Sequence, residues 1–257
     1  MKGVVAGLVM VLSALAVFGP GKTARAVPAV YVLGDSSLDV GNNNYLPGNS
    51  DPRANKPFHG VDFPGPGGPR PTGRFSNGYN VADFIGAGIL DSTDLYVMGA
   101  RKVGIINVGL SGCIPMARAR DATGACNDAA NELAAGFNGA LESFLADLAP
   151  RLPGLAYSLA DGFAHRQALI ADPQAAGFVS ATSACCGSGR LGGEGGCLPT
   201  SNICSDRDGY VYWDWVHATQ RAAKIAAEVF FHGPAQFTMP LTFKQLAEKK
   251  GADLIEQ

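Results

Sequence analysis

Two short polar stretches, far apart in the chain, hold the residue types that nucleophilic catalysis needs. Ser36 lies in the run G-D-S-S-L-D-V-G-N-N at residues 34–43, directly after an apolar stretch. Asp214 and His217 lie three residues apart in W-D-W-V-H, just before the last predicted helix. A serine hydroxyl is a weak nucleophile until a base takes its proton, and the base needs a third group to fix its tautomer. The three residues could therefore act as nucleophile (Ser36), base (His217) and orienting carboxylate (Asp214).

The position of each stretch suits this chemistry, although each also has a purely structural interpretation. A serine at the carboxyl end of a strand, in a turn made tight by Gly34, points its hydroxyl into the crevice outside the sheet. The three-residue spacing brings Asp214 and His217 to the same side of one turn. The structural alternatives are a polar β-turn at residues 34–43, and a helix cap at Asp214 with a packed His217. The other three histidines are interpreted as structural: His59 in a loop, His165 on a helix and His232 at a helix C-terminus.

The stretch at residues 34–43 resembles the GDSL block of the plant GDSL esterase/lipases, members of the SGNH hydrolase superfamily, in which G-D-S is followed shortly by D-x-G-N-N. W-D-W-V-H-A is similar to the terminal D-x-x-H-P block of that family, with Ala218 in place of the usual proline. The resemblance implies a hydrolase that cleaves carboxylic esters of small or lipid substrates through an acyl-enzyme, with Ser36, His217 and Asp214 in the roles given above. It implies no metal and no organic cofactor.

Four further stretches are similar to stretches that plant members carry in the same order. They are G-R-F-S-N-G (73–78), M-G-A-R-K (98–102), L-S-G-C-I-P (110–115) and A-C-C-G (184–187). Most of them are interpreted as structural, because Arg74 suits pairing with an acidic side chain and the glycines allow tight turns. Together the similar stretches cover most of residues 30–233.

The resemblance is incomplete in the residues that, in the family, donate hydrogen bonds to the oxyanion formed during acyl transfer. The family supplies the backbone N–H of the nucleophile, here Ser36, a glycine N–H from a G-x-N-x-A-x-x-G-A block, and an asparagine side chain from G-x-N-D. Only the tail of the glycine block is present, which leaves Gly86 as a candidate donor, and G-x-N-D does not occur. We therefore expect two internal stretches of the family pattern to be missing, including a central strand with its crossover helix.

The missing asparagine predicts weak activity, because each preorganised donor contributes on the order of 3–4 kcal/mol of transition-state stabilisation. Asn107, at the end of a predicted strand, is the candidate replacement by residue type. The alternative is a catalytically silent or unstable family member that binds an ester, a glycan or a wall polymer without turnover.

Six cysteines favour disulfide bonds, because an even number in an oxidising compartment is usually paired. Cys113 and Cys126 are close enough in the sequence to close a local loop. The pairing of the other four stays open, although the two adjacent ones are poor partners for each other: Cys185, Cys186, Cys197 and Cys204. A four-cysteine zinc site is the alternative, but it lacks the paired C-x-x-C spacing that is typical of such sites.

The elements that must position these residues alternate between strands and helices. We expect strands at 28–33, 102–108 and 155–159, and helices at 92–98, 128–148, 163–171 and 219–231. Ser76 or Asn77 can cap another helix that runs to residue 85, and residues 45–73 are expected to form a long surface loop. This order predicts an α/β fold, a three-layer αβα sandwich with a mostly parallel sheet as in SGNH and flavodoxin-like folds, without one central strand-helix segment.

The N-terminus is typical of a secretory signal peptide. Residues 1–26 contain Lys2, an apolar run at 4–18 and the small-x-small pattern A-R-A. The run is too short to span a bilayer, so we expect cleavage before Val27, a hydrolase domain at 27–257, and a secreted, extracellular protein without a stable membrane anchor.

The composition also limits the partners. Residues 1–26 hold three of the 20 Lys and Arg and none of the 22 Asp and Glu, so the processed chain carries 17 basic and 22 acidic side chains, a net charge of −5. This balance excludes a basic surface for nucleic acid or anionic membranes. With 47% hydrophobic and 16% charged residues, the chain is expected to form a sizeable core.

Overall fold

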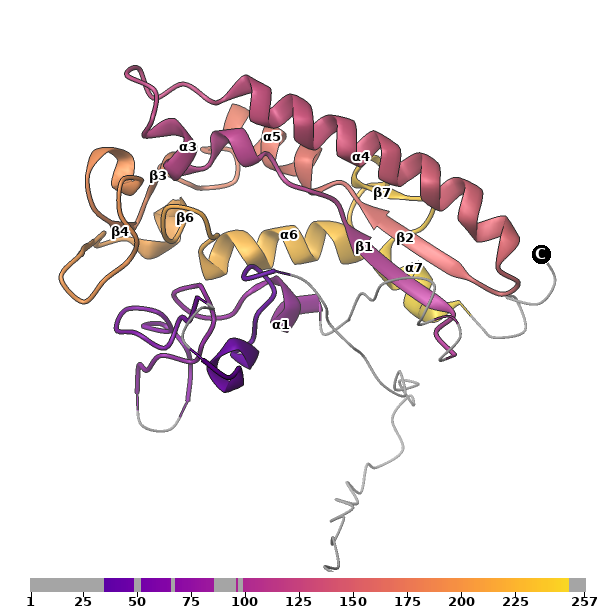
Figure 1. Cartoon of the computed structure of the whole chain (residues 1–257), viewed down its shortest axis with the longest axis horizontal. Helices are drawn as coiled ribbons and strands as arrows, with labels where there is room; N and C mark the ends of the chain where they lie inside the picture. Colours follow the sequence, from indigo (N-terminus) through magenta and orange to yellow (C-terminus); the bar gives the residue numbers. More distant parts are fainter. Residues whose placement is uncertain (1–34, 49–51, 66–67, 86–95, 97–98, 250–257) are drawn as a thin grey trace, which may run out of the picture.

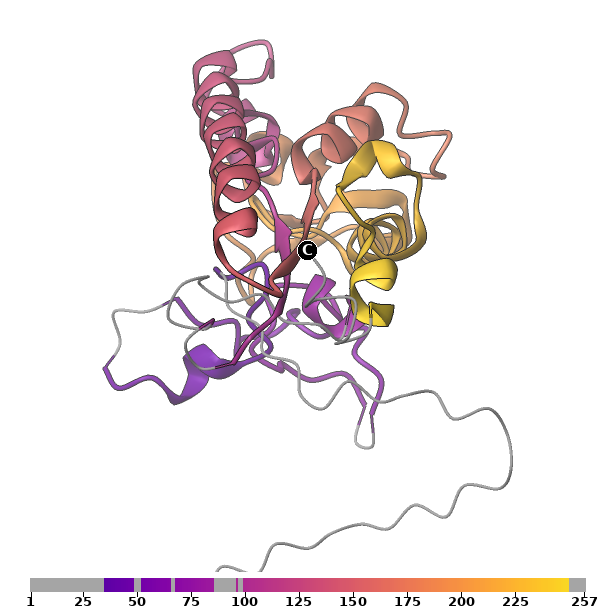
Figure 2. The same ribbon diagram turned by 90° about the vertical axis from the view of Figure 1, so that its right-hand side faces the viewer.

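The computed structural model of the chain describes residues 35–48, 52–65, 68–85, 96 and 99–249 (Figures 1 and 2). Several expectations from the sequence lie outside these residues: the signal peptide, the strand at 28–33, Gly34, Gly86 and all but one residue of the helix at 92–98. In the described residues, strands and helices alternate along the chain, which agrees with the expected α/β class.

The longest strands form a three-stranded sheet in the order β1-β2-β7. β1 (Lys102–Ile106) and β2 (Ala156–Ala160) are parallel, with Val103 opposite Tyr157, and β7 (Thr238–Met239) pairs antiparallel with the end of β2. Both parallel strands lie where the sequence predicted them, although β1 ends two residues earlier and β2 is shifted by one residue. In Figure 2, α4 lies on one side of this sheet, and α6 and α7 lie on the other.

The crossover from β1 to β2 contains the long helix α4 (Asp128–Leu148), whose bounds are those that the sequence predicted. The Asn127 side chain caps it by accepting a hydrogen bond from the Ala130 N–H. Short α3 (Pro115–Arg118) precedes it, and α5 (Gly162–Ala171) follows β2, one residue earlier than expected. The outer face of α4 leaves three large apolar side chains exposed: Leu133, Phe137 and Phe144.

The remaining described strands form two small sheets at the other end of the molecule (Figure 1). β3 (Ser180–Ala184) is parallel to β6 (Tyr210–Tyr212), and β4 (Cys186–Gly187) is antiparallel to β5 (Asn202–Ile203). The long connection between β3 and β6 is what a parallel pair requires, and it carries β4 and β5. Within the described residues, the strands are therefore divided among three sheets.

Helix α6 (Gln220–His232) runs between the β3-β6 sheet and the β1-β2-β7 sheet and shares a core with each of these two (Figure 1). The Thr219 side chain accepts a hydrogen bond from the Ala222 N–H, so Thr219 caps this helix and Asp214 does not. Near its start, the helix packs against a buried cluster around Phe178 and Val211. Near its end, Phe230 joins a second cluster; burial of a side chain of this kind contributes about 1.5–3 kcal/mol.

Helix α1 (Val81–Ile85) begins later than the sequence predicted, and neither Ser76 nor Asn77 caps it. The cap is Asn80, whose side chain accepts a hydrogen bond from the Asp83 N–H, while the Asp83 carboxylate accepts one from the Asn80 N–H. Asn77 is engaged elsewhere, because its side-chain oxygen accepts a hydrogen bond from the start of α6.

Helix α7 (Phe243–Glu248) was not predicted; the helix at 219–231 was expected to be the last one. Thr242 and Gln245 form a capping box at its start, which the T-x-x-Q spacing could have indicated. Phe243 is buried against Phe230 of α6. The region after α6 is therefore part of the core and covers one side of the β1-β2-β7 sheet.

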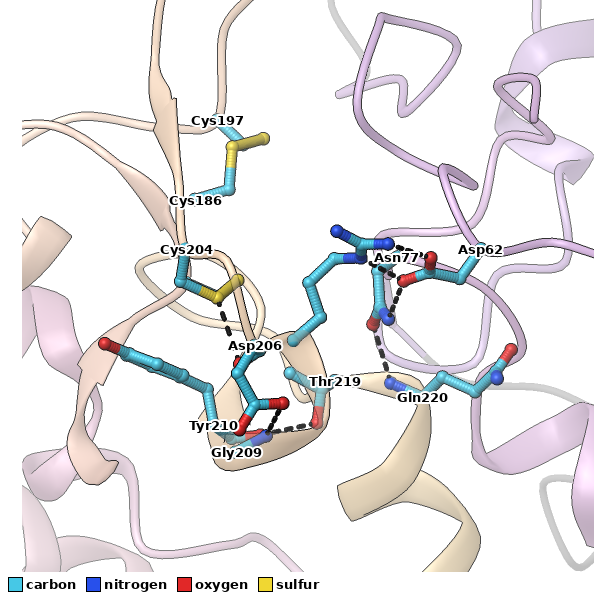
Figure 3. The surroundings of a disulfide bond; sticks show 12 residues. Asp62, Asn77, Cys186, Cys197, Cys204, Asp206, Gly209, Tyr210, Thr219 and Gln220 are labelled. Carbon is cyan, nitrogen blue, oxygen red and sulfur yellow. Dashed lines mark hydrogen bonds and ion pairs between the residues drawn. A yellow bond between two sulfur atoms is a disulfide. The ribbon is translucent and has the colours of Figure 1, made fainter. Parts of the chain in front are cut away.

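All six cysteines form disulfide bonds, and the expected pair Cys113–Cys126 is present. Cys185 bonds to Cys204 and Cys186 to Cys197, so the two adjacent cysteines have different partners. Figure 3 shows this cluster beside the first turn of α6. Buried Cys185, Cys186 and Cys197 pack against Trp213, which precedes Asp214 in the sequence, so the disulfides support the segment that carries the candidate base.

The region at 45–73 is more closely packed than the surface loop that its composition predicted. It begins in the short 3-10 helix at Asn42–Tyr45, and Ala54 forms a bridge with Gly73. Ala54 is fully buried, and His59 is only 5% exposed. Part of this segment therefore belongs to the interior.

Candidate active site

Ser36 lies in a turn at the start of the described residues. The Leu38 N–H donates to the Asp35 carbonyl oxygen at 3.1 Å. The Asp39 carboxylate accepts two backbone N–H groups of the following turn, and its carbonyl oxygen accepts a hydrogen bond from the Asn80 side chain. The polar residues after Ser36 thus hold the backbone in place, and Ser36 itself stays partly exposed.

Asp214 and His217 lie in the loop between β6 and α6. The Trp213 N–H donates to the His217 carbonyl oxygen at 2.8 Å and closes the loop. Asp214 Oδ1 accepts the backbone N–H groups of Val216 at 2.9 Å and His217 at 2.8 Å. The three-residue spacing therefore binds the carboxylate to the backbone of its own turn, which fixes its direction.

The structure brings the three residues singled out from the sequence together. Ser36 Oγ lies 2.7 Å from His217 Nε2, although the two residues are 181 positions apart. His217 Nδ1 lies 2.8 Å from Asp214 Oδ1 and 2.9 Å from Oδ2. We assign the Nδ1–H tautomer from these contacts, with Nδ1 donating to the carboxylate and Nε2 accepting from the hydroxyl.

The carboxylate of Asp214 is buried and charged. Asp214 is 3% exposed and His217 is 8% exposed. Burial alone raises the pKa of Asp214, but the charge and hydrogen bonds of His217, together with the nearby His59, outweigh it and hold the pKa well below its usual range. Asp214 is therefore ionised and can stabilise an imidazolium at His217.

The structure adds one residue that the sequence did not indicate. His59 Nε2 lies 3.7 Å from Asp214 Oδ2, which is too long for a hydrogen bond, so the contact is electrostatic. The Phe75 ring contacts both imidazoles, with centroids 4.7 Å from His217 and 5.9 Å from His59. No spacing in the sequence connects His59 with Asp214, because each lies in a different segment.

The segment that carries His59 and Phe75 is fastened to the start of α6. Asn77 Oδ1 accepts a hydrogen bond from the Gln220 N–H, and Asn77 Nδ2 donates to Asp62 Oδ2, both at 2.8 Å (Figure 3). Asp62 in turn accepts two hydrogen bonds from the Arg207 guanidinium. Because Gln220 is the first residue of α6, this segment and the loop of His217 share one support.

The Arg74 guanidinium connects α1 with the turn of Ser36. It donates two hydrogen bonds to Asp83, at 2.7 and 2.6 Å, and a third at 3.1 Å to the Val40 carbonyl oxygen. The sequence-based expectation of an acidic partner for Arg74 is confirmed.

Neither oxyanion candidate outside the triad is supported by a contact. Gly86 lies outside the described residues. Asn107 does not extend toward the triad: its Nδ2 donates to Asp161 Oδ1 at 2.9 Å, and its Oδ1 accepts from the Phe163 N–H at 3.1 Å. It lines a cavity of about 260 Å³ whose lining includes no triad residue. Asn107 therefore holds β1 to the start of α5.

Two features are absent from the described residues. In that part of the chain, no group of three or more His, Cys, Asp or Glu side chains could hold a metal ion. The same residues contain no helix with the length and apolar character needed to cross a membrane.

Comparison with known proteins adds an independent line of evidence. The profile of the family described as GDSL-like Lipase/Acylhydrolase matches residues 89–230, more than half of the chain. Asp214 and His217 lie inside this match, and Ser36 precedes it. GDSL esterase/lipase At5g55050 of Arabidopsis thaliana is 28% identical over 347 aligned positions, which cover 88% of this chain and 91% of that protein.

Two more relatives from Arabidopsis thaliana match a shorter part with higher identity. GDSL esterase/lipase At1g71250 is 37% identical over 154 residues, covering 59% of this chain and 41% of that protein. GDSL esterase/lipase 7 is 35% identical over 158 residues, covering 60% and 43%. The alignment with At5g55050 has more positions than this chain has residues, so that protein contains residues without a counterpart here.

Proposed function

Because this chain belongs to the GDSL-like lipase and acylhydrolase family, we propose that it is a serine hydrolase that cleaves carboxylic ester bonds in small or lipid substrates. The observation that carries the proposal is the continuous set of contacts from Ser36 Oγ through His217 to Asp214. A polar turn and a packed histidine would not require this alignment. The buried, ionised carboxylate behind the imidazole adds the charge that a general base needs.

In the proposed first half-reaction, Ser36 Oγ attacks the ester carbonyl carbon while His217 Nε2 takes the hydroxyl proton. The carbonyl electron pair moves to oxygen and then returns, which breaks the bond to the alkoxy group. His217 Nε2 gives its proton to the oxygen of the departing alkoxy group, which leaves as the alcohol. Ser36 Oγ keeps the acyl group as an ester. Asp214 holds the Nδ1–H of His217 and stabilises the imidazolium without taking a proton itself.

In the second half-reaction, water takes the place of the alcohol. His217 Nε2 removes a proton from the water as its oxygen attacks the acyl carbon, and then returns that proton to Ser36 Oγ as the acyl bond breaks. The products are the carboxylic acid and the free enzyme. We propose that the backbone N–H groups of Ser36 and Gly86 donate hydrogen bonds to the oxyanion in both steps.

The test is hydrolysis of a short-chain chromogenic ester by the purified chain of residues 27–257. We expect Ser36→Ala to reduce hydrolysis to the background rate, because among the described residues no other hydroxyl is hydrogen-bonded to His217 Nε2. Ser37→Ala is the matched control: its side chain is exposed and lies next to the proposed nucleophile, and it should keep the parent rate within about twofold. A Ser36→Ala variant as fast as the parent would overturn the assignment.

We also propose that the chain is exported, that residues 1–26 are removed, and that residues 27–257 form the hydrolase domain. The three disulfide bonds support export, because such bonds persist in oxidising compartments. N-terminal sequencing of the protein from the culture medium should begin at Val27. Recovery of the protein only inside cells, with residues 1–26 attached, would contradict this.

A second candidate function is binding without turnover. It is favoured by the absence of G-x-N-D from the sequence and by the residues of At5g55050 that have no counterpart here. In that case the folded parent would hydrolyse esters no faster than Ser36→Ala, yet would still bind them. Equilibrium binding of a non-hydrolysable ester analogue, measured beside the rate assay, separates the two candidates.

A further inference from the structure

We propose that His59 is a positioning residue for Asp214, which presents its Nε2–H to carboxylate oxygen Oδ2 and so keeps the carboxylate aligned with His217. This inference rests on the proposed function of the site and names a fourth side chain that the reaction would need. Asp214 Oδ2 then lies between two imidazole nitrogens, at 2.9 Å from His217 Nδ1 and 3.7 Å from His59 Nε2.

The packing around His59 leaves its ring little freedom. His59 is 5% exposed, and the edge of its ring meets Phe75 at an interplanar angle of 82°. The same Phe75 ring lies against His217 at an angle of 30°. Both imidazoles are thus held by one aromatic ring while both face one carboxylate, which makes their positions interdependent.

The proposed proton arrangement follows from burial. His59 Nδ1 is buried and has no hydrogen-bond partner among the described residues. A proton on Nδ1 would have no acceptor among the described residues, whereas a proton on Nε2 faces the Asp214 carboxylate. We therefore place a proton of the His59 ring on Nε2, directed at Asp214.

The backbone around His59 provides an independent observation. Phe58 has a φ angle of 76° and Gly60 has one of 72°, so left-handed conformations flank the histidine on both sides. For a bulky side chain such as Phe58 this conformation is uncommon, and such conformations concentrate where a site constrains the chain. The backbone is therefore constrained on both sides of His59.

A role through Asp214 predicts a specific kinetic pattern. His59 is buried behind the carboxylate, so its loss should leave substrate binding, and hence KM, within about twofold of the parent. Without this electrostatic contact the carboxylate holds the imidazolium of His217 less well, and a loss of about 1.4 kcal/mol of transition-state stabilisation corresponds to a tenfold lower rate. We therefore expect kcat to fall about tenfold in His59→Phe, which keeps a ring and removes the donor.

His59→Gln tests the donor itself, because its amide nitrogen reaches the position of Nε2. We expect it to restore kcat to within about threefold of the parent. The matched control is His165→Phe: His165 is also buried and also meets two phenylalanine rings, but among the described residues it forms no ion pair with a carboxylate. That variant should keep kcat and KM. If His59→Phe does not melt cooperatively, His59→Leu replaces it.

The labelling rate of Ser36 by a fluorophosphonate probe provides a second readout that does not depend on turnover. We expect it to be highest in the parent, slightly lower in His59→Gln and lowest in His59→Phe. Equal losses in His59→Phe and His59→Gln would mean that packing alone matters and would overturn the proposal. So would an unchanged kcat in His59→Phe, or a change confined to KM. Failure of the proposed function is distinguishable, because then the parent itself would show neither hydrolysis nor labelling above Ser36→Ala.

Discussion

Asp214 is the residue on which the candidate site depends most. Its carboxylate accepts two backbone N–H groups of its own turn and the imidazole N–H of His217, and it faces His59. These contacts keep it charged despite its burial, and the low pKa follows from them. A buried carboxylate with this many partners cannot rotate freely, so the direction of His217 is set before any substrate arrives.

A buried histidine outside the site provides a prediction about pH. Burial and, to a lesser extent, the neighbouring Arg166 lower the pKa of His165 to about 4. Below its ordinary pKa of 6.5, the unfolded chain binds a proton that the folded chain does not, so stability falls as the pH decreases from 6.5 toward 4. Between pH 7 and 5 we expect His165 to account for a loss of about 2 kcal/mol.

Urea unfolding of the parent and of His165→Gln at both pH values checks this. The variant lacks the titrating ring and should lose about 2 kcal/mol less than the parent over the same interval. Equal losses in the two proteins would show that His165 is not the group responsible.

The sequence could indicate those site residues whose signals are local. Ser36 follows a predicted strand in a polar turn, and Asp214 and His217 share one turn, so type and spacing were sufficient. His59 could not be found in this way, because its partner belongs to another segment and the contact exists only after folding. Asn107 was chosen by residue type alone, and its side chain proved to be engaged with Asp161.

At the scale of elements, the cap of α6 connects stability with the site. Thr219 Oγ accepts from the Ala222 N–H and donates to the Tyr210 carbonyl oxygen at 2.7 Å, and the residue is fully buried. We expect Thr219→Ala to reduce the free energy of unfolding by about 2 kcal/mol, because it removes both the helix cap and the hydrogen bond from Oγ to the Tyr210 carbonyl oxygen.

Thermal melts of Thr219→Ala and Thr219→Ser provide the measurement. The serine variant keeps the hydroxyl and should melt close to the parent, whereas the alanine variant should melt about 4–8 °C lower. An alanine variant that melts with the parent would mean that the cap does not contribute to stability.

The elements differed in how far the sequence could predict them. α4 has an asparagine cap, a long continuous pattern and Pro150 just after its end, and its bounds were correct. α1 was placed too early because Ser76 and Asn77 are as suitable for capping as Asn80, and only the tertiary bond from Asn77 to α6 decides among them. α7 is short, so its stability depends on tertiary packing such as the burial of Phe243. This packing cannot be predicted from a local sequence pattern.

At the scale of the whole molecule, the exposed face of α4 and the family stretches that this chain lacks lead to one prediction. Exposed Leu133, Phe137 and Phe144 lie on one face of this helix, an arrangement that monomeric proteins usually cover. We expect turnover of a simple ester about a hundred- to thousandfold below that of a relative that carries G-x-N-D, because one oxyanion donor is missing. We also expect a lower melting temperature.

This prediction is tested by measuring the turnover number and the thermal melt of this protein and of a relative that carries G-x-N-D under the same conditions. Comparable turnover together with a cooperative melt at a similar temperature would show that the missing family stretches are dispensable. Reduced turnover with a normal melt would assign the defect to the oxyanion site alone.

The contact between Ser36 and His217 also has a consequence for the order of folding. It joins residues 181 positions apart, whereas Asp214 and His217 meet within a single turn. Contacts of high sequence separation carry the largest loop-closure entropy and set the slow end of folding rates. The half of the candidate site that holds the proposed base can therefore form early, and the proposed nucleophile joins it only when the two ends of the described chain have come together. After dilution from denaturant with the disulfides intact, the helical signal should return first and ester hydrolysis last, so that catalysis itself reports the final closure of the chain.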